Sequence, residues 1–219
     1  MLSSYRSIIF ISLLCLLIGF LLIAKTFQLK LAGGSGYQAS HKFVVEDIQG
    51  EVYIDIAGRT HILNKGEIIE RGSILKTQPA SQIFLRSSSG IGIALHERTW
   101  LEFQKLWPTE YHLSLTKGRM IVFHHSLQEF PVTITTSKIK QNITKGTVSI
   151  VHYDFLSKIR IIPFDTSVEV LLDKKQKQQI QTPIDITEND LLITPANFDG
   201  NDLLLKYFYD WAFTRNDLQ

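Results

Sequence analysis

Cysteine is nearly absent from this chain, since Cys15 is the only one among 219 residues. A single thiol excludes a disulfide framework and a cysteine-ligated metal site, and its place inside an apolar segment excludes thiolate chemistry in the rest of the chain. Excess charge is also small: the formal net charge is +2, and no dense Lys/Arg cluster with interleaved aromatic residues occurs. No nucleic-acid partner is therefore expected.

Charge is absent altogether from residues 7–24, which read SIIFISLLCLLIGFLLIA. As a helix this segment would reach about 27 Å at 1.5 Å per residue, slightly less than the ~30 Å hydrocarbon core of a bilayer. Tyr5, Phe27 and the snorkelling side chain of Lys25 would complete the crossing. The sequence therefore predicts an uncleaved transmembrane helix over residues 7–27, which would anchor the chain in the cytoplasmic membrane.

A cleaved signal peptide is the alternative, because Arg6 gives the short tail of residues 1–6 a positive charge. The apolar run is longer than the roughly 7 to 15 residues usual in a signal peptide, and the small residues 32–34 lie too far beyond it for a normal cleavage site. A lipoprotein is also disfavoured, since Cys15 lies in the middle of the apolar run. The uncleaved anchor is the favoured interpretation.

The charges that flank the span leave its orientation open. Arg6 precedes the span, whereas Lys25, Lys30 and Lys42 follow it, and this count alone favours a cytoplasmic C-terminal side. A very short tail crosses a membrane easily, however, so flanking charge does not decide the orientation.

The rest of the chain predicts a single all-β domain. Residues 28–42 contain Gly33-Gly34-Ser35-Gly36 and predict a flexible linker. Over residues 43–195, short runs with period-two alternation recur about every ten residues between turn residues, which favours a β-sandwich or a related roll. No helix of core length interrupts these runs, so a parallel α/β sheet is not expected. The clearest runs are 43–45, 52–56, 83–85, 91–95, 100–103, 112–115, 120–123, 132–136, 148–151, 159–162 and 168–172.

Glycines and strands follow one another in a recognisable order within this region. Its parts are Gly50-Glu51-Val52, the block 63–77 with Gly66 and Gly72, the turn Leu115-Thr116-Lys117-Gly118, residues 130–135 and residues 146–150. This order resembles the FecR domain, an extracytoplasmic β module named after a ferric citrate regulatory protein. The family shows a G-x-V strand, an L-x-x-G-x-x-I-x-x-G-x-x-I-x-T block, an L-x-x-G turn, an F-x-V-x-T strand and a G-T-x-F-x-V strand in that order. The resemblance covers about residues 45–172.

The resemblance implies a β domain on the outer side of the cytoplasmic membrane, and it therefore selects the outward orientation. The family's founding regulator resembles a sigma-factor antagonist, with a cytoplasmic helical domain ahead of its span, whereas only residues 1–6 precede the span here. Direct sigma-factor binding is therefore not expected. Two further departures, at Ser89-Gly90-Ile91 and at Ser149, put in doubt any ligand carried over from the family.

Signals for catalysis are sparse, so no enzymatic activity, metal site or cofactor is predicted. His124 and His125 are strand neighbours that point to opposite faces, and we expect half-exposed positions that do not share a metal. The pair His96-Glu97, and Glu67 with Glu70, lack a third ligand or base. Weaker matches are the serines at 87–89 without a G-x-S-x-G elbow, Gly90-Ile91-Gly92 without a following helix, and the sequon Asn142-Ile143-Thr144.

The alternation of apolar residues along the strands and the size of the aromatic side chains also predict which residues form the core of the β domain. Gly118 and Gly146 are expected where strands reverse or bulge, because positive φ is cheapest for glycine. The predicted core residues are Ile68, Ile74, Leu85, Trp100, Phe103, Phe123 and Phe130.

The C-terminal part of the chain changes character. Residues 174–179 are polar and predict a solvated hairpin or loop, and residues 184–194 predict a strand pair that turns at Glu188-Asn189-Asp190. Residues 196–219 predict an amphipathic helix that packs against the β domain, with docking on a partner as the alternative. Its predicted apolar face consists of Leu203, Leu204, Tyr207, Phe208 and Trp211.

The sequence thus predicts a single-pass protein of the cell inner membrane whose FecR-like β domain faces the periplasm or the cell exterior. Its expected function is that of a non-catalytic binding, scaffold or envelope-signalling module, with another envelope protein or a cell-wall polymer as partner. Carbohydrate or peptidoglycan binding is the alternative, in which exposed aromatic residues such as Trp107 or Tyr111 line a groove. An envelope-polymer enzyme is a further, less favoured alternative.

Overall fold

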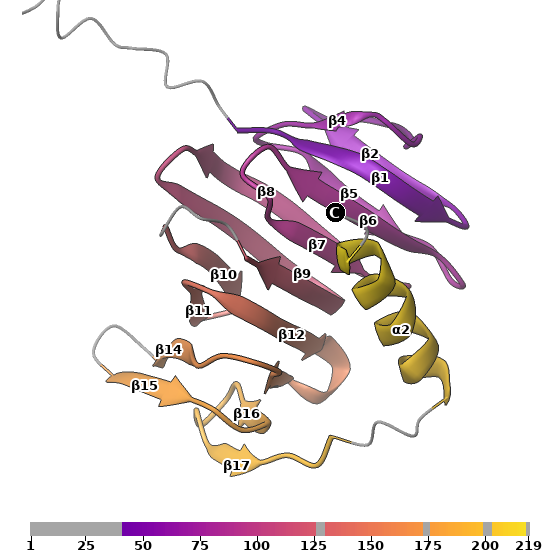
Figure 1. Cartoon of the computed structure of the whole chain (residues 1–219). Helices are drawn as coiled ribbons and strands as arrows, with labels where there is room; N and C mark the ends of the chain where they lie inside the picture. The colour runs from indigo at the N-terminus through magenta and orange to yellow at the C-terminus, as the bar shows by residue number, and fades with distance from the viewer. Residues whose placement is uncertain (1–40, 126–129, 173–175, 199–202, 218–219) are drawn as a thin grey trace, which may run out of the picture. The chain divides into compact units, whose positions relative to one another are not determined.

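A computed structural model describes residues 41–125, 130–172, 176–198 and 203–217 (Figure 1). All of them belong to one structural unit, Ala39–Gln219. The predicted transmembrane helix over residues 7–27 and most of the predicted linker lie outside these residues. Among the helices that the structure describes, none is long and apolar enough to cross a membrane.

Two β-sheets, here called sheet A and sheet B, make up this unit, and a single α-helix follows them. The prediction of a mostly β chain with one C-terminal helix is therefore confirmed. Sheet A pairs, in order, β4 (Ile68–Ile69), β1 (Phe43–Gln49), β6 (Gln82–Ser87), β7 (Gly92–Leu95), β9 (Glu110–His124), β12 (Gly146–Tyr153), β13 (Lys158–Pro163), β16 (Ile184–Thr187) and β17 (Ile193–Pro195). Sheet B pairs β3 (Arg59–Ile62), β2 (Val52–Ile56), β5 (Ile74–Thr77), β8 (Trp100–Trp107), β9, β10 (Val132–Thr136), β11 (Ile139–Ile143), β14 (Val168–Leu172) and β15 (Gln176–Ile180).

Strand β9 belongs to both sheets, and Gly118 is the point at which it changes from one to the other. Residues before Gly118 pair with β8 and β10, whereas Gly118 and the residues after it pair with β12. Gly118 has φ +99°, and a Cβ atom built there would lie 2.5 Å from the Cα atom of Thr99. The Thr99 hydroxyl accepts a hydrogen bond from the Arg119 amide at 3.0 Å and so fixes the bend. The sequence predicted two runs, 112–115 and 120–123, and the structure joins them into one bent strand.

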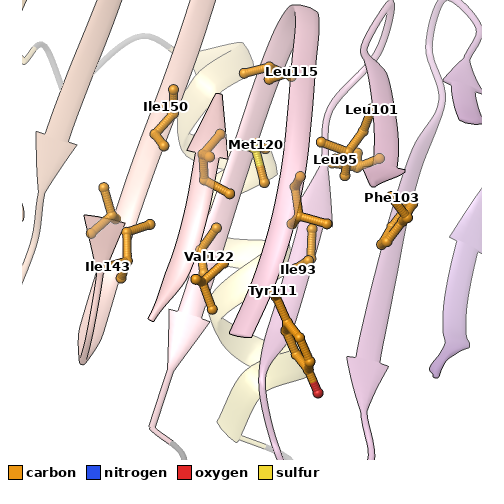
Figure 2. Packing of buried hydrophobic residues seen from close by; sticks show 14 of the residues in the cluster. Ile93, Leu95, Leu101, Phe103, Tyr111, Leu115, Met120, Val122, Ile143 and Ile150 are labelled. Carbon is orange, nitrogen blue, oxygen red and sulfur yellow. The ribbon is translucent and has the colours of Figure 1, made fainter. Parts of the chain in front are cut away.

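The core lies between the two sheets, where side chains from both halves of β9 meet (Figure 2). Phe43 of sheet A contacts Phe103 and Tyr111 of sheet B, with ring centroids 5.5 Å apart in each pair. Of the predicted core residues, Leu85, Phe103, Phe123 and Phe130 are buried. The prediction of inter-sheet core positions is therefore correct for Leu85, Phe103 and Phe130, whereas Phe123 is buried in a second cluster on the outer face of sheet A.

Three predicted core positions are wrong: at two of them the next residue in the sequence is buried instead, and the third lies on the exposed face of its strand. Ile68 is 45% exposed, while its neighbour Ile69 is fully buried, because Ile69 is paired with Phe43 at the edge of sheet A. In the same way Leu75 is buried and Ile74 only half-buried. Trp100 is 39% exposed and lies between the amines of Lys76 and Lys117, whose Nζ atoms are 5.1 Å and 4.4 Å from its ring centroid.

The C-terminal region contains the predicted hairpin and one unforeseen strand. β16 and β17 pair antiparallel on either side of the turn at residues 188–190, which confirms the predicted strand pair. Residues 176–180 form strand β15, which pairs with β14 along its whole length. The described part of the polar segment is therefore an exposed strand at the edge of sheet B, in agreement with the hairpin that was one of the two predicted alternatives.

Helix α2 (Leu203–Asp217) covers the outer face of sheet A, where it crosses β6, β7 and β9 (Figure 1). It begins later than the predicted segment 196–219. Its buried side chains pack onto a second apolar cluster that faces away from the inter-sheet core, and the expectation that the helix packs against the β domain is confirmed. This cluster consists of Phe84, Ala94, Ile121, Phe123, Phe208, Tyr209, Trp211 and Ala212, with Leu205 and Phe213 at its border.

The face of α2 that packs differs in part from the predicted one. Phe208 and Trp211 are buried as predicted, but Tyr207 is 65% exposed. The helix is apolar around much of its circumference, so the periodicity of its sequence does not decide which face is buried. Contact with Phe84 and Phe123 on the outer face of sheet A buries the face that contains Phe208 and Ala212. The side chains of Leu203 and Leu204 lie outside the described part of the chain.

Candidate binding surfaces

The two neighbouring histidines at the end of β9 diverge, as the strand geometry predicted. The Nε2 atom of His124 lies 2.7 Å from the Phe130 carbonyl oxygen, and the Nε2 atom of His125 lies 3.1 Å from the Thr147 hydroxyl. His124 is 1% exposed, so the predicted half-exposed position is wrong for it, because Phe130 packs against it with the two ring centroids 5.6 Å apart. Within the described ranges, no group of three His, Cys, Asp or Glu residues is arranged to hold a metal ion.

The acidic pairs considered from the sequence are separated by their hydrogen-bond partners. Glu67 bonds to His61 with an oxygen to Nε2 distance of 2.6 Å, whereas Glu70 lies 2.7 Å from the amine of Lys42. Glu97 accepts a hydrogen bond from the Ala80 amide. Each carboxylate therefore has its own structural contact, and the arrangement offers no shared acid/base pair.

A chain of hydroxyl groups joins the serines at 87–89 to residues that sequence reasoning did not connect with them. Ser87 and Ser89 are 2.7 Å apart through their Oγ atoms, Ser89 is 2.9 Å from the Tyr111 hydroxyl, and Nδ1 of His41 is 2.6 Å from the same hydroxyl. Tyr111 is fully buried, which corrects its prediction as an exposed groove residue; burial raises its pKa. Because Ser87 also accepts the Ile91 amide at 3.0 Å, the chain stabilises the 87–91 turn and the start of β1.

The outer face of sheet A carries a polar row under and beside helix α2. His96 lies beside Arg119 on the next strand, Arg119 is separated from Arg160 by Val151, and Arg160 is paired with Asp185. The Arg160 guanidinium contacts the Asp185 carboxylate at 2.7 Å and 2.9 Å, and this contact lowers the pKa of Asp185. The row thus combines two arginines and one ion-paired carboxylate across four neighbouring strands.

Arg119 is the least satisfied member of this row. It is 9% exposed, and its Nε and Nη1 atoms make no hydrogen bond within the part of the chain that the structure describes. Its guanidinium carbon lies 5.9 Å from the ring centroid of Tyr209 on α2, and the Tyr209 hydroxyl lies 3.0 Å from that of Ser149. The family departure at Ser149 is therefore located beneath the helix, where a larger side chain would meet Tyr209.

His96, on this face, makes the stability of the fold depend on pH. Burial, with the neighbouring charge of Arg119, lowers the pKa of His96 from 6.5 to about 4, and its ring lies 4.6 Å from that of Phe208. Since the pKa is lower in the folded state, the unfolded state binds more protons between these values, and stability is lost as the pH falls from 6.5 toward 4. We expect a loss of about 2 kcal/mol from pH 7 to pH 5 through this group.

Urea unfolding of the purified chain at both pH values measures this loss, with His96→Gln as the comparison. The variant should lose about 2 kcal/mol less than the natural chain over the same interval. Equal losses in both proteins would show that His96 is not held in its neutral form by the fold.

The outer face of sheet B is open, since no described helix covers it (Figure 1). The exposed rings of Trp100 and Trp107 lie near the two ends of β8, and the amine of Lys105 is 4.7 Å from the Trp107 ring centroid. Trp107 is 37% exposed, in agreement with its predicted role as a surface aromatic residue. Lys76 and Lys117 flank Trp100 and have no ion-pair partner among the described residues.

A polar ladder runs across β10, β11, β14 and β15 on the same face. The Thr133 hydroxyl donates to the Asn142 amide oxygen, and the Asn142 amide nitrogen donates to Glu169, both at 2.9 Å. Hydrogen bonding from Asn142, with the amine of Lys177 at 3.3 Å, lowers the pKa of Glu169. Asn142 therefore uses both ends of its amide within the sheet, which argues against the sequon as a modification site.

A shallow pocket opens beside this ladder, at the border between sheet B and its loops. Glu169 supplies a carboxylate, Asn142 and Gln179 supply amides, and Thr144 and Ser167 supply hydroxyls, while Pro131 forms an apolar wall. Such a lining can accept and donate hydrogen bonds to a polyhydroxylated ligand. None of these residues except Asn142 and Thr144 was singled out from the sequence, because the pocket brings together four separate segments.

Comparison with known proteins shows a likeness in fold alone. No family model matches the chain, and no curated protein matches it. Two crystal structures of a proposed anti-sigma factor from Parabacteroides distasonis are similar, with TM-scores of 0.52 and 0.51 at 10% and 11% sequence identity. The likeness covers 61% and 60% of this chain and 64% and 62% of theirs, so less than two thirds of those proteins is represented here.

Proposed function

We propose that this chain is a non-catalytic binding module of the cell envelope, with a FecR-like β domain held outside the cytoplasmic membrane by residues 7–27. The observation that carries the proposal is the open outer face of sheet B, where Trp100 and Trp107 are exposed among lysines. Exposed aromatic side chains on an uncovered face are typical of surfaces that bind another macromolecule. The proposed partner is another envelope protein.

A signalling version of this role has one further point in its favour. The fold that the chain shares with the Parabacteroides protein belongs to a protein named as an anti-sigma factor. A regulator of that kind acts through contacts and needs no catalytic constellation. Direct binding of a sigma factor is not part of the proposal, which places the contact between envelope proteins.

Protease accessibility tests the proposed location. In spheroplasts, added protease should digest the β domain and leave a small anchored fragment, because the domain would face outward from the span. A cytoplasmic marker protein that stays intact in the same sample is the control. If the β domain is protected until detergent opens the membrane, the proposed orientation is wrong.

Carbohydrate or peptidoglycan binding is the second candidate, and the pocket around Glu169 is the observation that favours it. Sedimentation of the full chain with insoluble peptidoglycan separates the two candidates. If the pocket binds the polymer, Glu169→Gln should reduce the bound fraction about tenfold, since charged hydrogen bonds contribute about 1.5–3 kcal/mol. The proposed protein-binding role predicts no sedimentation above that of a control membrane protein.

A further inference from the structure

Two neighbouring hairpin tips expose apolar side chains that the fold does not use. The turn between β12 and β13 contains the short 3-10 helix η1 (Asp154–Leu156), in which Phe155 is 80% exposed and Leu156 is 54% exposed. Leu192, in the turn between β16 and β17, is 55% exposed. Large apolar side chains that protrude in this way contribute nothing to the core and are typical of contact surfaces.

The two tips form one surface because their strands are paired. Lys158 at the start of β13 lies opposite Thr187 at the end of β16, and the Glu188 amide donates to the Ser157 carbonyl oxygen at 2.8 Å. The apolar residues of both turns are thus presented side by side at one end of the sandwich. We refer to Phe155, Leu156 and Leu192 as the apolar tip.

Each turn holds its apolar residue with an aspartate and a left-handed backbone. The Asp154 carboxylate accepts the Phe155 amide at 3.0 Å, and the Asp190 carboxylate accepts the Leu192 amide at 3.1 Å. Ser157 and Leu191 have positive φ values of 47° and 55°, a conformation that non-glycine residues adopt at a cost. Both aspartates are exposed, so the apolar tip has an acidic rim.

The tip lies about one strand length from the part of the domain where the described chain begins. His41 contacts Tyr111 and Phe130, and Phe130 contacts His124 at the end of β9. β12 starts opposite His124 and runs eight residues away from it before the tip begins, which is roughly 25 Å at the rise of a strand. An anionic bilayer surface is also not complementary to the two exposed aspartates of the tip.

We propose that the apolar tip docks into an apolar pocket, rimmed by lysine or arginine side chains, on a partner protein of the envelope. Phe155 is 80% exposed, so an occupant must surround its ring, and the exposed carboxylates of the tip are complementary to a basic rim. The pocket around Glu169 on a second copy of this chain does not fit the tip, since that pocket is polar and contains a carboxylate. This inference rests on the proposed binding function and adds a second contact surface, separate from the outer face of sheet B.

Site-specific photocrosslinking of the full chain in intact cells tests the inference. A photoreactive phenylalanine analogue replaces Phe155 in one variant and Tyr207 in a control, since Tyr207 is also aromatic and is 65% exposed on the far side of α2. We expect an adduct with one protein from position 155 and none from position 207. In an Asp154→Lys, Asp190→Lys background the yield should fall at least about tenfold, because charge reversal at a docking rim weakens association.

The captured protein is then purified and mixed with the full chain in detergent. Binding that Phe155→Ser weakens by at least about thirtyfold, with an unchanged melting midpoint, supports the inference, since an aromatic anchor commonly contributes that much. An adduct with lipid or with a second copy, an adduct insensitive to charge reversal, or no adduct at position 155 overturns it. A protein adduct at position 207 but not at 155 would agree with the proposed binding function and would refute only the proposed role of the apolar tip.

Discussion

Replacing Phe208 by alanine is expected to destabilise the protein by about 3–5 kcal/mol, which is the usual cost of truncating a buried aromatic side chain. Phe208 is fully buried between α2 and sheet A, where its ring stacks with that of Trp211 and contacts that of His96 at a tilt of 52°. In a domain of this size the melting midpoint should fall on the order of 10 °C. Near-ultraviolet circular dichroism of the purified chain during heating measures the shift.

Two further variants calibrate this result along the same helix. Trp211→Ala should cost about 2–4 kcal/mol, because Trp211 is 7% exposed and contacts Phe84. Tyr207→Ala should change stability by no more than about 0.5 kcal/mol, since its side chain lies in solvent. If Phe208→Ala melts like the natural chain, α2 is a docking element and not a part of the folded domain.

Replacing Gly118 by alanine is expected to have an effect of similar size for a different reason. A Cβ atom there would lie 2.4 Å from the Thr99 hydroxyl and 2.5 Å from the Thr99 Cα, and the residue has φ +99°. The strain of positive φ and the overlap with backbone atoms each cost about 1–3 kcal/mol. Urea unfolding should therefore show a loss of roughly 2–5 kcal/mol, together with a less ordered junction between the sheets.

Gly72→Ala is the matched control for this substitution. Gly72 has a similar positive φ of 85°, but a Cβ atom there meets nothing within 4 Å. Only the conformational cost of about 1 kcal/mol should remain. Equal losses in the two variants would mean that the close approach of Thr99 to the bend in β9 is not what makes Gly118 necessary.

Local patterns predicted the elements of this fold well, because turns and alternation depend on neighbouring residues. The runs at 52–56, 132–136 and 168–172 correspond to β2, β10 and β14, and the C-terminal hairpin and helix form as expected. The same reasoning failed where two apolar residues stand side by side. At Ile68 and Ile69, only the pairing of Ile69 with Phe43 decides which side chain enters the core, and a long-range pairing has no local signature.

The helix face and the surfaces were harder to predict, because both depend on what the sheets bring together. Tyr207 and Phe208 are aromatic neighbours in the sequence, and the rings of Phe84 and Phe123 on sheet A pack against Phe208. Arg119 carries no motif, and its neighbours His96 and Arg160 come from other strands. The apolar tip has a partial signature, since Phe155 and Leu156 follow an aspartate between the predicted runs 148–151 and 159–162, but their adjacency to Leu192 depends on the pairing of β13 with β16.

The central claim is that this chain acts by contact with another protein outside the cytoplasmic membrane. Its most direct test is to treat intact cells that contain the full chain with a membrane-impermeant crosslinker and to identify every covalent adduct of the chain. The account predicts a discrete adduct that contains a second protein of the envelope. Adducts with cell-wall polymer alone, or a chain that reacts only after the membrane is opened, would contradict it.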